Sequence, residues 1–475
     1  MKFALTGLFI LALSLLFFGW LYDYSAMLHL LPQGSHIWRQ ADCMAMAENY
    51  RQFHLPFLQP EVYNLQSTNG KVAGEFPIFY FLAAQFANVT FALRCLHTFV
   101  FIAGIIGVYF VALYFLQRRF LTLIACWFLC TSPLLVFYGN NFLSDVPALS
   151  MAFIGWAFFL YGNKKERFSF LIIAFLFFAM AALLKASEYI SFVLAFLFLW
   201  KFKKLSLKTI TLFLIAIIPL AWYGYARRYN IENHDTYYFL SVAPIWKLSL
   251  YNIGLGAWRM LVSLSNNYFW RPTSVLLIVA SYYVFKHRKR LDADLRWMII
   301  SSGMMVFLYI LFFYEKMLGH EYYYIPFFLF FLFLLIGILK TYNCFHAENV
   351  FTHAPLFLFM IPNIFFCKNF VSKKITDSHY NAMLAYKEIQ SFLIEHRVDE
   401  SKSILSLPDD SPNKTLFLLK RKGYTAYNDY KKILKEKKAD YLLLSDKNAE
   451  TRKEIQPYLA DSIADYKGVT LYKLK

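Results

Sequence analysis

Residues 33–50 (QGSHIWRQADCMAMAENY) bring charged and amide side chains into a chain that is otherwise strongly apolar. Ser35 is placed to cap a helix that begins near His36. Arg39 and Asp42 are three residues apart on that helix, so they are neighbours on its surface. A carboxylate held beside a guanidinium at a membrane edge is a candidate general base. The alternative is an interfacial amphipathic helix whose charges are only solvated, and the pattern favours neither.

Other polar residues are expected at the same membrane face, at the ends of apolar segments. They are Glu48, Lys71, Glu75, Asn140, Asn141, Asp145, Lys185, Glu188, His320, Glu321, Tyr322 and Tyr323. Charges at membrane level are costly and usually functional. Cations would bind a phosphate, a carboxylate would deprotonate a hydroxyl, and aromatic rings would stack on sugars. The structural alternatives are a helix cap at Asp145, an ion pair between Lys185 and Glu188, and an interfacial belt of tyrosines.

The composition is that of a polytopic membrane protein with some soluble mass. Of the 475 residues, 59% are hydrophobic and only 16% are charged, against about 25% charged in ordinary soluble domains. The net charge of +18 is explained by basic loops facing anionic lipid, since no nucleic-acid-binding motif is present. No CxxC pair and no His/Cys cluster occurs. No metal or other cofactor is therefore indicated, although a divalent metal stays open.

Eleven apolar segments predict membrane-spanning helices, the first of them uncleaved. They cover residues 3–22, 91–116, 121–138, 146–161, 168–184, 189–200, 207–225, 273–285, 297–314, 322–339 and 350–366. If residue 1 is cytoplasmic, every loop that falls inside carries Lys or Arg, as the positive-inside rule requires. This predicts a cytoplasmic N-terminus and an extracytoplasmic C-terminus.

The predicted organisation is a transmembrane domain over residues 1–367, which includes an outer loop at 23–75, and a small α/β domain over 368–475. In the second domain, helices are expected at 378–398, in a segment ending at Gly423, at 428–438 and at 450–459, and strands at 403–407, 440–445 and 469–474. It has no glycine-rich phosphate loop and no nucleophile elbow, so an accessory role is expected.

The polar motifs together resemble bacterial glycosyltransferases of the GT-C superfamily, closest to the family 39-like group of protein O-mannosyltransferases and the lipid A aminoarabinose transferase. The resemblance rests on Trp38-Arg39-Gln40-Ala41-Asp42, Gly74-Glu75-Phe76-Pro77, residues 141–147 and His320-Glu321-Tyr322-Tyr323. It implies a polyprenyl-phosphate sugar donor and an inverting transfer on the outer face of the bacterial inner membrane. It also implies a catalytic aspartate in the first outer loop, which is Asp42 here.

The same resemblance points to a second acidic residue, for which Glu75 is the nearer match and Asp145 the weaker. Cys43 departs from the family pattern, which has a small or hydroxyl residue there. The absence of a basic-Pro-Pro run beside Pro77 argues against an aminoarabinose substrate.

We therefore expect Asp42 and Glu75 to be catalytic. The residues expected to bind substrate are Arg39, Lys71, Asp145, Lys185, His320, Tyr322 and Tyr323. The expected partners are a polyprenyl-phosphate sugar, membrane lipid and a glycan, lipid or protein acceptor, with no nucleic acid. A lipid-linked sugar flippase or transporter and a non-catalytic membrane scaffold are the alternatives. No internal repeat supports the first, and the charged outer loop argues against the second.

Overall fold

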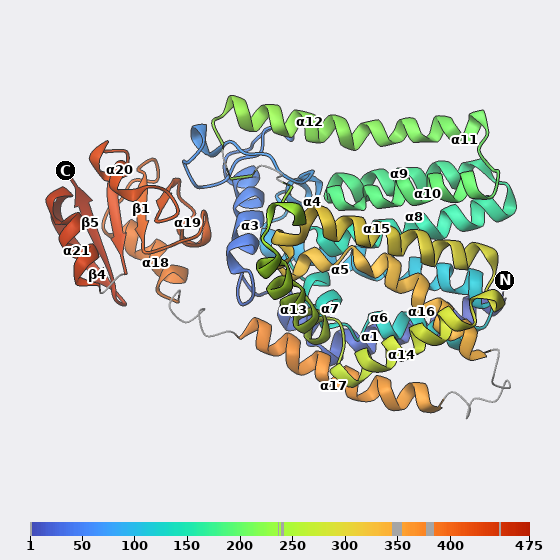
Figure 1. Cartoon of the computed structure of the whole chain (residues 1–475). Coiled ribbons are helices and arrows are strands. Elements are labelled where there is room, and N and C mark those ends of the chain that lie inside the picture. Colours follow the sequence, from blue (N-terminus) through green and yellow to red (C-terminus); the bar gives the residue numbers. More distant parts are fainter. Residues whose placement is uncertain (1, 236, 239–241, 344–353, 377–383, 446–447) are drawn as a thin grey trace. The chain divides into compact units, whose positions relative to one another are not determined.

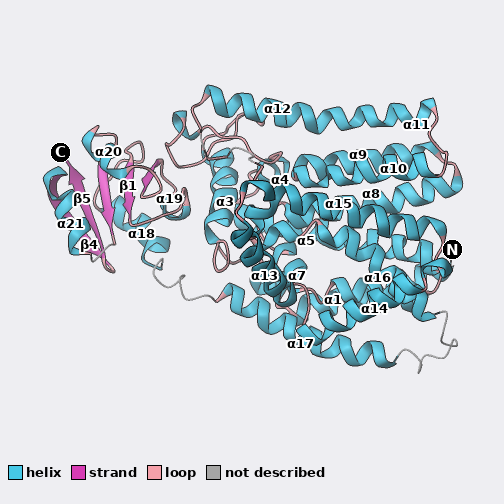
Figure 2. Cartoon of the chain, in the orientation of Figure 1, coloured by secondary structure: helices cyan, strands magenta, loops and turns pink. Residues whose placement is uncertain are grey.

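The computed structural model describes residues 2–235, 237–238, 242–343, 354–376, 384–445 and 448–475. Most of these residues are helical, and the named strands all lie near the C-terminus (Figure 2). The contacts divide the chain into two compact units. One comprises Met1–Leu28, Arg94–Tyr223 and Ser241–Lys373, and the other comprises His29–Leu93, Gly224–Leu240 and Lys374–Lys475. The predicted division at residue 367 stays a prediction, because contacts alone do not test independent folding.

The first unit is built from apolar helices, of which α8 and α9 lie side by side (Figure 1). Two long helices, α5 (Val89–Leu116) and α12 (Ile217–Glu232), continue into the second unit. The other helices of the first unit are α1 (Lys2–Leu21), α2 (Tyr24–Met27), α6 (Arg119–Leu129), α7 (Pro133–Gly139), α8 (Asp145–Lys165), α9 (Phe168–Leu184), α10 (Ile190–Lys201), α11 (Leu207–Thr211), α13 (Leu250–Asn267), α14 (Arg271–Lys286), α15 (Ala293–Met317), α16 (Phe327–Asn343) and α17 (Ala354–Ile375).

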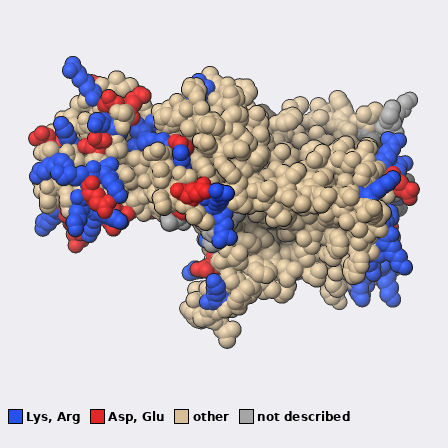
Figure 3. Space-filling model, turned by 90° about the horizontal axis from the view of Figure 1, so that it is seen from above, with Lys and Arg blue, Asp and Glu red and all other residues tan. Residues whose placement is uncertain are grey.

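Several of these helices are long and apolar enough to cross a membrane. Among the described residues there are four, namely α5, α8, α15 and the continuous run Leu207–Glu232, or five when the bent pair α6 and α7 counts as one span. Shorter apolar helices cover Leu5–Leu21, Phe168–Leu184 and Phe327–Tyr342. Figure 3 shows a broad surface without charged side chains over the helices, as lipid contact requires. A mostly helical protein with several helices long and apolar enough to span a membrane is thus confirmed, whereas the count of eleven spans stays a prediction.

Some predicted spans differ from the observed helices. The span expected at 121–138 is two helices, α6 and α7, bent by 73°, because Pro133 begins α7 and lacks the backbone donor that a continuous helix needs. The span expected at 322–339 begins as a 3-10 turn, Glu321–Tyr324, before α16. Residues 350–353 of the last predicted span lie outside the described residues. The helix α13 was expected as part of an outer loop.

The C-terminal residues form a five-stranded sheet in the order β2-β1-β3-β5-β4. The strands are β1 (Ile404–Leu407), β2 (Gly423–Thr425), β3 (Tyr441–Leu444), β4 (Leu459–Tyr466) and β5 (Val469–Leu474), and the helices are α18 (Leu384–Glu395), α19 (Lys414–Leu419), α20 (Tyr430–Lys435) and α21 (Ala449–Ile455). The strands β1, β2 and β3 are parallel, while β5 pairs antiparallel with β3 and β4. Three predicted strands are confirmed.

Two strands of this sheet were missed. The helix predicted to end at Gly423 ends at Leu419, and Gly423 begins β2. The helix predicted over 450–459 gives way to β4, whose largely exposed Asp and Ser residues lack a hydrophobic strand pattern. Residues 378–383 of the predicted helix at 378–398 lie outside the described residues.

The second unit joins this sheet to the first outer segment, which contains α3 (Ile37–Gln52) and α4 (Ile78–Ala83). Asn64 forms a parallel bridge with Gly423 at the start of β2. The amide of Leu65 donates to the Gly423 carbonyl at 2.8 Å, and the amide of Gly423 donates to the Tyr63 carbonyl at 3.0 Å. Residues 63–65 therefore extend the edge of the C-terminal sheet.

Candidate functional site

The helix α3 is buried over most of its length. Every residue from Gln40 to Tyr50 is buried, so α3 is not the solvated amphipathic helix that was the alternative reading. His36, not Ser35, is its N-cap residue. Ser35 contributes its carbonyl instead, which accepts a hydrogen bond of 2.7 Å from Nε2 of Gln40. The buried face carries Asp42 into the interior of the unit.

Asp42 is 1% exposed, and both of its carboxylate oxygens accept hydrogen bonds. Oδ1 accepts from Nδ2 of Asn413 at 2.9 Å, and Oδ2 accepts from the Tyr237 hydroxyl at 3.2 Å. Nη1 of Arg39 lies 3.9 Å from Oδ2. Burial raises the pKa of Asp42 to about 6, against the opposing effects of Arg39 and the hydrogen bonds. A carboxyl with this pKa is ionised at neutral pH and is still basic enough to accept a proton.

Arg39 lies between two carboxylates. Its Nη2 donates to both carboxylate oxygens of Glu75 at 2.8 Å, and its guanidinium lies 5.9 Å from the centre of the Tyr238 ring. The structure therefore brings Arg39, Asp42 and Glu75 together, and their roles stay predictions. We call Arg39, Asp42, Glu75, Tyr237 and Asn413 the Asp42 cluster.

A second polar cluster lies in the helical unit. Nζ of Lys185 is 3.0 Å from Oδ1 of Asp145 in the first turn of α8. The same ammonium lies 5.6 Å and 5.9 Å from the ring centres of Tyr322 and Tyr323. His320 stacks on Tyr322 with ring centres 5.3 Å apart. These five residues, which we call the Lys185 cluster, are all predicted substrate-binding residues.

Glu188 lies beside this cluster, in the 3-10 turn Ala186–Tyr189, and is 2% exposed. Burial raises the pKa of its carboxyl to about 8, and the nearby Asp145 carboxylate raises it further while Lys185 opposes both. Near neutral pH the protonated form predominates. Lys185 forms an ion pair with Asp145, and whether it also pairs with Glu188, the structural alternative, stays open.

Other predicted polar residues have separate surroundings. Lys71 lies in an isolated β-bridge with Glu61. Asn140 accepts hydrogen bonds from Arg94 through its backbone oxygen at 2.6 Å and its side-chain oxygen at 3.1 Å. The carbonyl of Asn141 lies 2.8 Å from Nδ1 of His97. Arg94 and His97 were not singled out because they stand within an apolar helix, where a buried polar residue carries no periodic signal.

Tyr237 and Asn413 were also missed as site residues. Tyr237 follows a short polar stretch between apolar segments, where the high content of tyrosine is typical of a membrane interface. Asn413 stands 371 residues after Asp42, and no local pattern links the two. A cleft of about 730 Å³ along the C-terminal half of α3 is likewise new, and its lining includes Glu48, Tyr50 and Lys420.

In the part of the chain that the structure describes, no group of three or more His, Cys, Asp or Glu side chains is arranged to hold a metal ion. The Asp42 cluster offers two carboxylates, but the guanidinium of Arg39 lies between them.

A scan against protein-family models found no match, and neither did a search of curated proteins. Solved structures do match. The crystal structure of ArnT from Cupriavidus metallidurans bound to undecaprenyl phosphate is 10% identical with a TM-score of 0.61, over 98% of this chain and 97% of that chain. Arabinofuranosyltransferase AftD from Mycobacteria is 12% identical with a TM-score of 0.59, over 98% of this chain and 40% of its own.

An archaeal protein also matches over most of the chain. The oligosaccharyltransferase AglB from Archaeoglobus fulgidus, in complex with an inhibitory peptide and a dolichol-phosphate, is 12% identical with a TM-score of 0.53, over 92% of this chain and 69% of that chain. At these identities the likeness is one of fold. The matched proteins share the GT-C architecture, and the chain therefore has the fold of the GT-C membrane glycosyltransferases.

Proposed function

We propose that this protein transfers a sugar from a polyprenyl-phosphate donor to an acceptor hydroxyl, with Asp42 as the general base. The observation that carries the proposal is the buried Asp42 carboxylate beside Arg39 and Glu75 in a chain with the GT-C fold. Undecaprenyl phosphate bound to ArnT and dolichol-phosphate bound to AglB support a lipid-phosphate donor. A buried carboxyl with a shifted pKa is typical of catalytic sites.

In the proposed reaction the acceptor oxygen attacks C1 of the sugar from the face opposite the phosphate. The bond between C1 and the phosphate oxygen breaks, and its electron pair leaves with the polyprenyl phosphate. The acceptor proton passes to Oδ2 of Asp42, because Oδ1 is held by Asn413. The Tyr237 hydroxyl is the more distant partner at 3.2 Å, and the acceptor hydroxyl takes its place. One displacement inverts the configuration at C1.

Cations are needed where the phosphate leaves. Arg39 is held by Glu75, so Glu75 acts by fixing the guanidinium rather than as a second base. Considered by itself, the Lys185 cluster of the helical unit offers an ammonium and aromatic rings of the kind that bind a lipid phosphate. Asp145 forms an ion pair with Lys185.

We place this reaction on the outer face of the bacterial inner membrane, with the N-terminus in the cytoplasm and the C-terminal sheet outside. The basic loops predicted to face the cytoplasm support this orientation. The outer segment 29–93 and the residues 374–475 share one compact unit, which supports placing both on the same side.

The test is the substitution Asp42→Asn in the full-length protein, with Asp440→Asn as the control. Asp440 pairs with Lys402 at the protein surface. Purified protein is incubated with radiolabelled undecaprenyl-phosphate hexoses and pentoses, and the release of undecaprenyl phosphate is measured. We expect Asp42→Asn to reduce transfer by about 10²–10⁴-fold and Asp440→Asn to leave it unchanged.

Three outcomes would contradict the proposal. Near-normal transfer by Asp42→Asn would remove Asp42 from the mechanism. Movement of the labelled lipid across vesicles by the wild-type protein, without bond cleavage, would make it a flippase. The absence of both cleavage and movement would favour a scaffold.

A further inference from the structure

The strand β1 lies at the point of the C-terminal sheet where ligands are usually bound. Its parallel neighbours are β2 on one side and β3 on the other, so the chain runs from β1 to β2 and then reverses its direction along the sheet to reach β3. In open α/β sheets the crevice at the carboxyl ends of such strands is the usual ligand site. The loop that emerges there comprises residues 408–413 and leads into α19.

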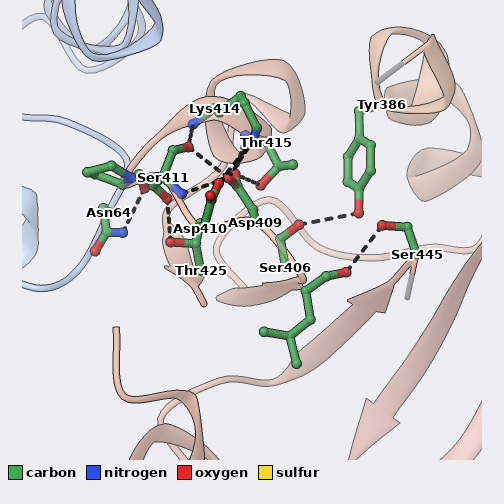
Figure 4. Close-up of polar contacts among 12 residues, drawn as sticks. Asn64, Tyr386, Ser406, Asp409, Asp410, Ser411, Lys414, Thr415, Thr425 and Ser445 are labelled. Carbon is green, nitrogen blue, oxygen red and sulfur yellow. Dashed lines mark hydrogen bonds and ion pairs between the residues drawn. The ribbon is translucent and has the colours of Figure 1, made fainter. Parts of the chain in front are cut away.

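Hydrogen bonds from side chains of the loop, of α19 and of β2 hold this loop in place (Figure 4). The buried Asp409 accepts hydrogen bonds from the backbone amides and hydroxyls of Ser411 and Thr415, at 2.6 to 3.0 Å. The hydroxyl of Thr425 in β2 donates to the Ser411 carbonyl at 2.6 Å. Lys414 pairs with Asp409 at 3.3 Å. Because the loop is fixed at these points, the side chain of its last residue, Asn413, is held in one orientation.

The place of a ligand is taken by the outer segment of the same unit. Nδ2 of Asn64 donates to the Pro412 carbonyl at 2.7 Å and to Oδ1 of Asn428 at 3.0 Å. The amide of Asn64 donates to Oδ1 of Asn413 at 3.0 Å. Asn64 and Asn413 are each 0% exposed. The loop therefore binds the outer segment, which contains Arg39, Asp42 and Glu75.

Asn413 has a role beyond local structure. It is the N-cap residue of α19, a position where an asparagine side chain normally accepts from the helix backbone, yet its side chain makes no cap bond. Its Nδ2 points to Oδ1 of Asp42 at 2.9 Å instead. A donor to the carboxylate fixes its rotamer and favours its ionised form.

We propose that the C-terminal α/β segment completes the catalytic centre, with Asn413 as the positioning residue that holds Asp42. This inference rests on the proposed function, in which Asp42 is the base. By occupying Oδ1, Asn413 leaves Oδ2 as the atom that receives the acceptor proton. The segment predicted as an accessory domain is then part of the site, and its β1–α19 loop serves the reaction rather than a separate ligand.

The experiment compares Asn413→Ala, Asn413→Asp and the matched control Asn428→Ala. Asn428, which lies between β2 and α20, is another hydrogen-bond partner of Asn64 and has no hydrogen bond to Asp42 among the described contacts. Asn413→Asp keeps the shape and the acceptor for Asn64 but loses the donor. The full-length proteins are assayed with the undecaprenyl-phosphate sugar that the wild type cleaves, and kcat/KM is measured from pH 4.5 to 9.

We expect the acidic limb of kcat/KM to move up by about one pH unit in Asn413→Ala, which lowers the rate about tenfold at low pH. The limb should move further in Asn413→Asp, because a second carboxylate faces Asp42. It should stay in place in Asn428→Ala. Unmoved limbs in both Asn413 variants, with Asp42→Asn inactive, would overturn this inference and leave the proposed function standing. An active Asp42→Asn would overturn the proposed function itself.

Discussion

At the scale of single residues, the proposed chemistry depends on Asp42, an aspartate that the fold buries. An ordinary aspartate has a pKa of about 3.9 and is a weak base. Burial raises the pKa of Asp42 to about 6, while Arg39, Asn413 and Tyr237 keep it from rising further. The carboxylate therefore combines a higher affinity for protons with ionisation at neutral pH, which suits a general base.

We expect kcat/KM to rise with pH through about 6 and to fall about tenfold per unit below it. The reason is that only the ionised Asp42 accepts the acceptor proton, and its pKa is about 6. The measurement is initial rates of undecaprenyl phosphate release between pH 4.5 and 8.5. An acidic limb near pH 4 would show that Asp42 is not the titrating base.

The raised pKa of Asp42 makes folding stability fall with rising pH, whereas kcat/KM is expected to rise. Because the folded-state pKa of Asp42 is raised, the folded protein binds its proton more tightly than the unfolded chain does. The stabilising contribution is therefore present at low pH and is lost as the pH rises through about 6. Folding is favoured by the protonated form of Asp42, whereas the proposed reaction requires the ionised form.

Tyr237→Phe tests the second hydrogen bond of Asp42. The hydroxyl donates to Oδ2 at 3.2 Å and lowers the pKa of Asp42, so its loss should raise the acidic limb by up to about one pH unit. Tyr427→Phe is the control, because the Tyr427 ring packs on Tyr237 with centres 5.1 Å apart without a hydrogen bond to Asp42 among the described contacts. Equal shifts in both variants would point to packing instead.

At the scale of elements, the start of α8 and the turn after α9 meet through a buried ion pair. Asp145 is in the first turn of α8, and Lys185 precedes the 3-10 turn Ala186–Tyr189. A buried pair adds little net stability, whereas breaking it by removing one partner is costly. A gain in stability alone therefore does not explain the presence of this ion pair.

Lys185→Met should lower the free energy of unfolding by about 3–5 kcal/mol, because it removes the ammonium from beside the buried Asp145 carboxylate. The double variant Asp145→Asn/Lys185→Met should recover much of this loss. Its transfer activity should stay at least about tenfold below wild type, since the ammonium that we propose binds the phosphate is absent. Thermal unfolding in detergent and the transfer assay measure the two effects. Wild-type activity in the double variant would reduce Lys185 to a structural residue.

Elements could be predicted from the sequence where local physics determines them. The length and apolar composition of α5 and α8 indicated spans, and the buried run in β3 indicated a strand. The sequence contains Pro133 but did not indicate a bend of 73°, because the angle of the bend depends on packing. The strand β4 was not predicted, because its polar, largely exposed sequence gives no local sign that it pairs with β5.

At the scale of the whole molecule, the compact unit that contains Asp42 is assembled from three distant segments. These are His29–Leu93, Gly224–Leu240 and Lys374–Lys475. Arg39 and Asp42 could be paired from the sequence because they share a helix face. Tyr237 and Asn413 could not, since contacts over 195 and 371 residues leave no local periodicity. Part of the Asp42 cluster was thus predictable, and the part contributed by other segments was not.

The predicted orientation in the membrane is tested by labelling with a membrane-impermeant maleimide. Asp410→Cys places a thiol in the C-terminal sheet domain, at a side chain that is 91% exposed. Glu166→Cys places one in the exposed turn between α8 and α9, which carries Lys164 and Lys165 and is predicted to be cytoplasmic.

In intact spheroplasts we expect the maleimide to label the Asp410→Cys protein and not the Glu166→Cys protein, and to label both after lysis. The wild type supplies the background, because its described cysteines are buried apart from the partly exposed Cys95. Labelling of Glu166→Cys in intact spheroplasts would place the basic turns outside. It would reverse the predicted orientation and so place the Asp42 cluster on the cytoplasmic side. A sugar delivered on the outer leaflet could not reach the base there.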